Sequence, residues 1–174
     1  LVEQALLATG GFPNEGIDHV VKRFLENYSG AATRFSKIFP SATETLSTLH
    51  DMGLRIGICT NKPETPAYEI LRAFNLSDYI DIVVGGDTIP GIRKPDGRHL
   101  HAVLEGLKIP IKKAVMVGDN LNDATAAREL GVPFVAVSFG YAHGPIEELQ
   151  ADTVINHFDE LIGALNILDP DSRK

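Results

Sequence analysis

Residues 114–123 have the sequence Ala-Val-Met-Val-Gly-Asp-Asn-Leu-Asn-Asp, in which an apolar run ends at a glycine and two aspartates follow, four residues apart. A short, nearly continuous apolar run is typical of a β-strand that is buried on both faces. Four more such runs flank it along the chain, at residues 54–60, 80–84, 133–137 and 152–156. The chain is therefore expected to contain five such strands.

The segments between these runs have a helical period instead. In each of four segments, a set of residues shares one face of a predicted helix. The sets are Leu46, Leu49 and His50; Ala67, Ile70, Leu71 and Phe74; Leu100, Val103, Leu104 and Leu107; and Ala124, Ala127, Arg128 and Leu130. The last of these patterns stops at Gly131, a residue suited to a helix end. Alternating strands and helices predict an α/β fold, with a Rossmann-like parallel sheet covered by helices on both faces.

The first forty residues differ from the rest because they contain no strand-like run. Apolar residues in 17–28 recur at the spacing of an amphipathic helix, and residues 2–7 resemble the end of an earlier helix. Gly10, Gly11 and Pro13 separate the two. The pattern predicts a helical appendage that joins the α/β part near Phe39-Pro40.

Composition narrows the class of protein. A length of 174 residues fits one domain, or one domain with a small appendage. The net charge of −7 argues against nucleic acid as a partner but not against small phosphate ligands, which need only a few local donors. No apolar run has membrane-spanning length, and no signal-peptide pattern opens the chain. The single Cys59 fits a reducing compartment, so we expect a cytoplasmic protein without a membrane partner.

Ligands of open α/β sheets collect beyond the carboxyl ends of the strands. Three polar groups occupy or approach such positions, namely Thr60-Asn61-Lys62, Lys94-Pro95-Asp96 and the pair Asp119 and Asp123. Of these residues, Thr60 offers a hydroxyl, Lys94 a cation, and Asp119 with Asp123 a carboxylate pair. Mg²⁺ needs only one or two protein carboxylates when a substrate phosphate and water complete its ligands. The set is therefore suited to phosphate and magnesium.

Each residue of this set also has an ordinary structural interpretation. Asp119 is suited to cap a helix, and Asp123 could be a solvated residue inside it. Pro95 favours the first position of a helix, which would leave Lys94 as an exposed residue at its entrance. Asn61 could cap the next helix. Taken singly, none of these motifs is specific.

Their order and spacing are more specific than any one of them. Thr60-Asn61 at a strand end, then Arg93-Lys94-Pro95, then Val117-Gly118-Asp119 with Asp123, resemble the second, third and fourth motifs of the haloacid dehalogenase superfamily. The segments 59–63, 84–87, 116–119 and 139–144 are similar to the bacterial phosphoglycolate phosphatase branch of that superfamily. The resemblance covers essentially the whole chain.

The resemblance implies two parts, residues 1–39 as the C-terminal part of a helical cap and residues 40–174 as an incomplete α/β core. It implies a magnesium-dependent phosphomonoester hydrolase that acts through an aspartyl-phosphate. Thr60 and Asn61 would bind the phosphoryl group, and Lys94 would stabilise its charge. Asp119 would hold Mg²⁺, and Asp123 would orient Lys94 or the metal's water molecules. Asp87 would be structural, and the loop from Tyr141 to His143 would flank the pocket.

The family's nucleophile is an aspartate of a D-x-D-x-T/S motif on the first strand, and this motif does not occur in the sequence. The nearest match, Asp169-Pro170-Asp171-Ser172, follows no strand. We therefore expect the nucleophile to lie upstream of Leu1 and this chain to be inactive alone. Loss of the first strand would expose apolar sheet surface, through which the chain could associate with itself.

Other interpretations stay open at this point. A phospho-receiver domain also combines aspartates, a threonine and a lysine on an α/β sheet, but it would not explain the helical front end. A metal-free dehalogenase would not need both Asp119 and Asp123. A truncated, non-catalytic phosphate-binding or interaction module remains the main alternative. The substrate is expected to be a small phosphorylated molecule, with phosphoglycolate favoured over other phosphomonoesters such as sugar phosphates. Cys59 and His99 receive only structural interpretations.

Overall fold

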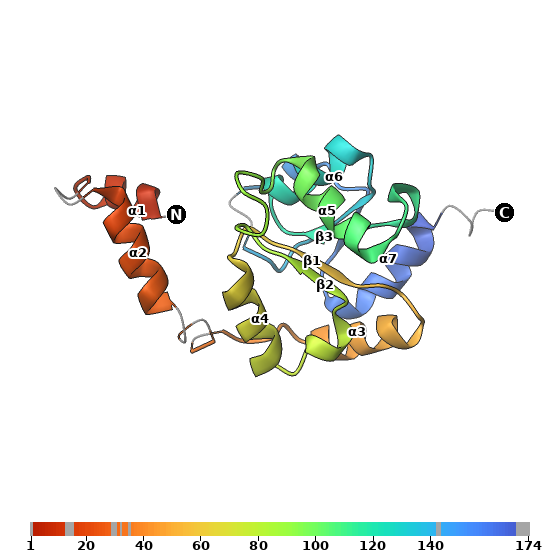
Figure 1. Ribbon diagram of the computed structural model, residues 1–174. Helices are drawn as coiled ribbons and strands as arrows, with labels where there is room; N and C mark the ends of the chain where they lie inside the picture. The colour runs from red at the N-terminus through yellow and green to blue at the C-terminus, as the bar shows by residue number, and fades with distance from the viewer. Residues whose placement is uncertain are drawn as a thin grey trace. The chain divides into compact units, whose positions relative to one another are not determined.

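Each apolar run of the sequence contains one short parallel strand. The computed structural model describes residues 2–12, 16–28, 31, 33–34, 36–141 and 144–169. The strands are β1 (Gly57–Cys59), β2 (Ile82–Val84), β3 (Met116–Gly118), β4 (Phe134–Val137) and β5 (Thr153–Ile155). Between and around them lie α3 (Ala42–Asp51), α4 (Glu64–Ala73), α5 (Gly97–Leu107), α6 (Leu121–Leu130) and α7 (Leu161–Leu168), as Figure 1 shows. The prediction of an α/β fold with parallel strands is confirmed.

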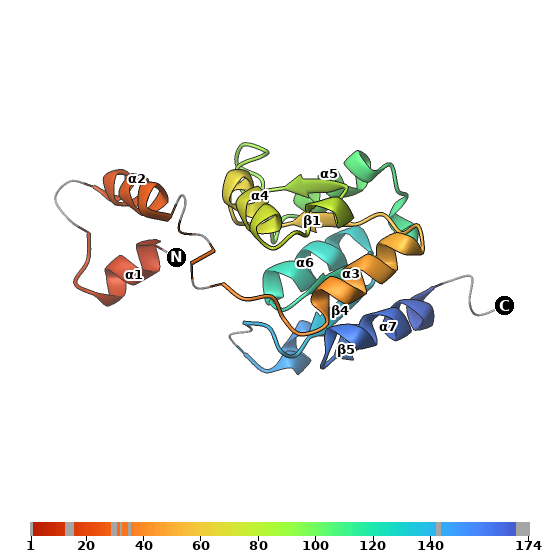
Figure 2. The same ribbon diagram turned by 90° about the horizontal axis from the view of Figure 1, so that it is seen from below.

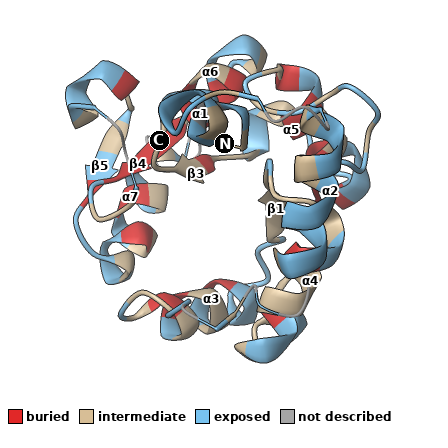
Figure 3. Cartoon of the chain, turned by 90° about the vertical axis from the view of Figure 1, so that its left-hand side faces the viewer, coloured by how far each residue is buried: buried red, intermediate tan, exposed pale blue. Residues whose placement is uncertain are grey.

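Successive strand residues point to two different layers of helices, as the period of a strand requires. On one face, Phe134 and Ala136 pack in a cluster with residues of α5 and α6. On the other face, Val135 and Val137 pack with Leu49 of α3 and with α7. Both faces of β4 are covered, and all four of its residues are buried (Figure 3). This explains why its sequence is a continuous apolar run rather than an alternating one.

The sheet is in two pieces. One piece pairs β1 with β2, and the other has the order β3-β4-β5. Helices join the pieces, because α5 packs against α6 on one face, while α3 contacts both the turn at Ser77–Tyr79 and the turn at Phe158–Glu160 (Figure 2). No strand of the described chain pairs β1 with β3, so each has one unpaired edge.

The two unpaired edges converge on the same side chains. In a parallel strand the backbone groups of successive residues point to opposite sides. Thr60 N bonds to β2, so the backbone of Cys59 points away from β2; its carbonyl accepts a bond from Lys94. Likewise Met116 bonds toward β4, and the backbone N–H of Asp119 points away from β4 to Asp123. Lys94 and Asp123 are themselves paired. The unpaired edges of β1 and β3 therefore both face this ion pair.

Residues 1–37 and 38–174 are two separate compact units. The first contains α1 (Val2–Ala8) and α2 (Ile17–Tyr28), in which Phe24 stacks on Tyr28 with ring centroids 5.7 Å apart. No residue of α2 is buried. The assignment of the first unit to a cap and of the second to an incomplete core stays a prediction.

Candidate active site

The centre of the candidate site is a buried ion pair between Lys94, which precedes α5, and Asp123, in the first turn of α6. Lys94 Nζ lies 2.5 Å from Asp123 Oδ1, and their side chains are 11% and 4% exposed. Lys94 Nζ also donates to the Cys59 carbonyl at the end of β1, at 2.5 Å. The pair therefore joins the two pieces of the sheet at their carboxyl ends. Asp123 is not a solvated surface residue.

The capping of α6 fixes the carboxylate of Asp123. Asn120, not Asp119, is the N-cap residue, and Asp123 completes a capping box by accepting the backbone N–H of Asn120. The second oxygen, Oδ2, accepts the N–H groups of Asp119 and Asn120 at 3.2 and 3.3 Å. A side chain at Gly118 would place its Cβ 2.5 Å from Asp123 Cβ. Gly118 is therefore needed for this close approach.

Asp119 lies at the carboxyl end of β3 and is held by its neighbours. Its Oδ2 accepts the backbone N–H of Tyr141 at 2.6 Å, and its Oδ1 accepts a bond from Asn120 Nδ2 at 3.1 Å. The interpretation of Asp119 as a helix cap is wrong, because Asn120 is the N-cap residue. The Asp119 carboxylate instead accepts a hydrogen bond from the loop after β4. Tyr141 contributes its backbone N–H here, and the residue as a whole is 77% exposed. His143 lies outside the described residues.

Replacing Gly140 by Ala is expected to displace Asp119. A Cβ at Gly140 would overlap the Asp119 side chain, whereas a Cβ at Gly163 in α7 meets nothing within 4 Å. Overpacking of this kind costs about 1–3 kcal/mol. We expect Gly140→Ala to lower the free energy of unfolding by that amount and to speed hydrogen exchange of the Tyr141 amide. Gly163→Ala is the matched control and should leave both unchanged or raise stability slightly; equal behaviour of the two variants would contradict the proposed packing.

Thr60 and Asn61 lie at the end of β1, beside Lys94. Thr60 Oγ1 accepts the N–H of Lys62 at 3.1 Å, which leaves its own O–H to donate. Asn61 Nδ2 donates to the Lys94 carbonyl at 2.8 Å. The expectation that Asn61 caps the next helix is wrong. Asp87 does so from the loop after β2, since its Oδ1 accepts the N–H of Glu64 at 2.8 Å.

The entrance to α5 also differs from the expectation. Pro95 is not its first residue, because α5 begins at Gly97 and Asp96 is the N-cap residue. Asp96 accepts the backbone N–H of Arg98, and hydrogen bonds from the Arg98 side chain lower the pKa of Asp96 to about 2. Lys94 is consequently outside the helix, and its side chain turns toward the end of β1.

A divalent cation fits one position of this site. Among the described residues no group of three or more His, Cys, Asp or Glu side chains gathers as a metal cage. Asp123 Oδ1 is paired with the Lys94 ammonium and already balances its charge. From the described residues, each oxygen of Asp119 accepts one bond, and a carboxylate oxygen has a second lone pair for a cation. One carboxylate suffices for Mg²⁺ when water and a substrate phosphate supply the other ligands.

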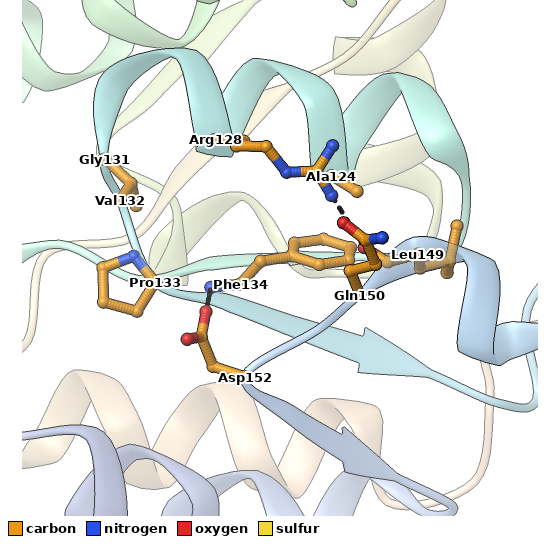
Figure 4. A pocket seen from close by; sticks show the side chains of 9 residues that line it. All are labelled: Ala124, Arg128, Gly131, Val132, Pro133, Phe134, Leu149, Gln150 and Asp152. Atoms are coloured by element: carbon orange, nitrogen blue, oxygen red, sulfur yellow. Dashed lines mark hydrogen bonds between the residues drawn. The ribbon is translucent and has the colours of Figure 1, made fainter.

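Two cavities lie beside the piece of the sheet that contains β3, β4 and β5. One of about 580 Å³ adjoins the candidate site and is lined by Asp119, Asn120, Leu121, Asn122, Tyr141, Gly144, Pro145, Glu148 and Leu149. The other, of about 310 Å³, lies at the amino ends of β4 and β5, where Arg128 donates to the Leu149 carbonyl and Asp152 accepts the N–H of Phe134 (Figure 4). Only the first is at the edge where ligands of such sheets bind.

Comparison with known proteins agrees with the fold and identifies the family. A solved structure described as a predicted phosphoglycolate phosphatase from Haemophilus somnus 129pt superposes with a TM-score of 0.82, at 25% identity over 91% of this chain and 70% of that one. The chain thus has the Rossmann-type α/β fold of that structure. A family model for haloacid dehalogenase-like hydrolases matches residues 3–131, and the chain belongs to that family.

Two relatives carry a more specific name. The phosphoglycolate phosphatase of Caulobacter vibrioides is 40% identical over 159 residues, which are 91% of this chain and 67% of the relative. That of Agrobacterium fabrum is 37% identical, over 88% of this chain and 65% of the relative. This chain thus spans about two thirds of their length. Within the described residues, no helix has the length and apolarity to cross a membrane.

Proposed function

We propose that this chain forms the larger part of a magnesium-dependent phosphomonoesterase that acts on phosphoglycolate. The observation that carries the proposal is the convergence of Lys94, Asp123 and Asp119 with Thr60 and Asn61 at the carboxyl ends of β1 and β3. Names of the relatives favour phosphoglycolate over other small phosphomonoesters. The single, half-buried Cys59 fits a reducing compartment, and we place the activity in the cytoplasm.

The residues of the chain bind and neutralise a phosphoryl group in this proposal. A lysine ammonium has three N–H donors, and among the described residues Lys94 uses two, for Cys59 and Asp123. The third would bond a phosphoryl oxygen. Thr60 would donate its O–H, and Asn61 its second amide N–H. Asp119 would hold Mg²⁺, which supplies positive charge to the phosphoryl oxygens when bound.

The nucleophile is the part that this chain does not provide. Asp123 is committed to Lys94 and Asp119 to Tyr141, so neither is positioned to attack. We propose that a carboxylate from a segment upstream of Leu1 attacks phosphorus while the bond to the leaving oxygen breaks. A second carboxylate of that segment gives the leaving oxygen a proton and later takes one from the water that hydrolyses the aspartyl-phosphate.

The test is release of inorganic phosphate from phosphoglycolate. We expect the chain alone to release none above background. The same chain extended at its N-terminus by the first third of the Caulobacter vibrioides relative is expected to release phosphate, and removal of Mg²⁺ with EDTA should stop it. In the extended chain, Asp119→Ala should lower kcat/KM by roughly 10²–10³-fold, whereas Asp51→Ala, at an exposed carboxylate of α3 outside the site, should not.

Two outcomes would count against the proposal. Release by the chain alone that Asp119→Ala abolishes would mean that another residue is the nucleophile. Binding of tungstate by the folded, extended chain without any turnover would favour the alternative, a non-catalytic phosphate-binding module.

A further inference from the structure

His99, in the first turns of α5, is a buried polar residue that the proposed reaction does not use. Its exposed fraction is 0%. The two ring nitrogens contact two different strand ends. Nε2 lies 2.9 Å from the carbonyl oxygen of Gly85, just after β2, and Nδ1 lies 3.4 Å from Sγ of Cys59, the last residue of β1. A histidine that merely filled space would not need both contacts.

The partners determine where the proton is. A carbonyl oxygen can only accept, so Nε2 must carry the hydrogen that bonds Gly85. In the neutral ring Nδ1 is then an acceptor, and the Cys59 thiol donates to it. Burial raises the pKa of the Cys59 thiol to about 11, so the thiol keeps the hydrogen that this contact requires. For the neutral ring, these two contacts therefore select the Nε2–H tautomer of His99.

The same cysteine also accepts from Lys94. The Cys59 carbonyl bonds the Lys94 ammonium, while the Cys59 side chain bonds His99. In addition, Asn61 bonds the Lys94 backbone carbonyl at 2.8 Å. The beginning of α5 and the end of β1 are thus joined through several polar contacts, and His99 extends this connection to Gly85. Its neighbour Gly86 packs tightly too, since a Cβ there would overlap the backbone of Asn61.

We propose that His99 is a positioning residue for the phosphate site: its Nε2–H bond to Gly85 and its contact with Cys59 fix α5 against β1 and β2, and so place the Lys94 ammonium beside Thr60 and Asn61. The phosphate-binding part of this inference rests on the proposed function. The positioning of Lys94 does not, because it concerns contacts within the chain.

The test compares three variants. His99→Leu removes both contacts, and His99→Gln keeps an N–H donor near the position of Nε2. His101→Leu is the matched control on the same helix, because the His101 side chain is 45% exposed and its Nδ1 lies 3.7 Å from Glu105. For each protein we would measure the imidazole ¹⁵N shifts, the ¹H–¹⁵N signal of the Lys94 ammonium, and the dissociation constant of inorganic phosphate, well below the unfolding temperature.

We expect the wild-type His99 to show the Nε2–H tautomer. His99→Leu should weaken phosphate binding by about tenfold or more and broaden or shift the Lys94 signal, as loss of an orienting partner does in other sites. His99→Gln should restore most of both, and His101→Leu should change neither.

Results of three kinds would overturn the inference. These are an Nδ1–H tautomer in the wild type, a Lys94 signal that His99→Leu leaves unchanged, and a loss of stability in His99→Leu without any change at Lys94. If His99→Leu does not fold, the tautomer of the wild-type His99 and the Lys94 signal of His99→Gln still test the positioning role. If even the wild type binds no phosphate, the proposed function loses its support, while the tautomer and the Lys94 signal still test the positioning role.

Discussion

Asp123→Ala is expected to lower the free energy of unfolding by about 3–5 kcal/mol, the cost of leaving a buried charge without its partner. Lys94 is only 11% exposed, and Asp123 supplies its counter-charge at 2.5 Å. The same change removes the acceptor for the backbone N–H groups of Asp119 and Asn120. Denaturation by urea at pH 7 measures the effect directly. Binding of inorganic phosphate should be lost as well, because the Lys94 ammonium is no longer held.

A double variant separates loss of charge balance from loss of packing. Lys94→Met with Asp123→Asn removes both charges but keeps an oxygen to accept the two N–H groups of the α6 cap. It should regain stability to within about 2 kcal/mol of the wild type while still failing to bind phosphate. Asp51→Ala, at an exposed carboxylate of α3, is the control and should change stability little. An Asp123→Ala variant as stable as Asp51→Ala would show that the pair is solvated and would remove the basis of the site.

The second large effect is expected in hydrogen exchange at the facing edges of β1 and β3. The backbone groups of Gly57, Cys59 and Val117 point away from the strands that pair with β1 and β3. Their amides should exchange on the order of 100-fold faster than those of Ile58 and Met116, which are paired within the sheet. The comparison is internal, because neighbouring residues of one strand share the same local environment.

Extension of the chain with the segment that carries the proposed nucleophile should slow these amides to the rate of their neighbours. The reason is that an extended segment between β1 and β3 would accept their hydrogen bonds and place its carboxylates beside Lys94. Equal protection of neighbouring amides in the chain alone would show that the edges are already paired. Extension that restores turnover without protecting Cys59 and Val117 would mean that the nucleophile comes from elsewhere.

Local pattern was enough for most of the fold. Each of the five strands lies within its predicted run, and α2 to α6 coincide with predicted helical segments. The family was also evident from the order of strand-end motifs, and the family model confirms it. No amphipathic period marked the helix α7, because its run of apolar residues lacks a distinct polar face. Roles for Thr60, Asn61, Lys94, Asp119 and Asp123 stay predictions, although the structure brings these residues together.

The errors concern helix starts, where several residues compete for the same few N–H groups. Asn61, Pro95 and Asp119 each had a plausible local role at a helix start, and none of them has that role in the structure. The N–H of Glu64 is instead bonded by Asp87, 23 residues away in the chain. Sequence spacing cannot rank such partners, because the choice depends on which loop the sheet brings near. The hydrogen bond from the Tyr141 backbone N–H to Asp119 is a further example of a partner that sequence spacing did not indicate.

The sequence by itself determined the alternation of strands and helices. A strand that is buried on two faces is a continuous apolar run, whereas a helix that is buried on one face repeats its apolar residues at the helical period. The sequence also determined which polar residues end the strands. Only the tertiary structure decided that Asp123 belongs to Lys94 and that His99 joins Cys59 to Gly85. Those pairings depend on how α5 and α6 pack across the ends of separate strands. That packing brings together residues tens of positions apart, and no local period records it.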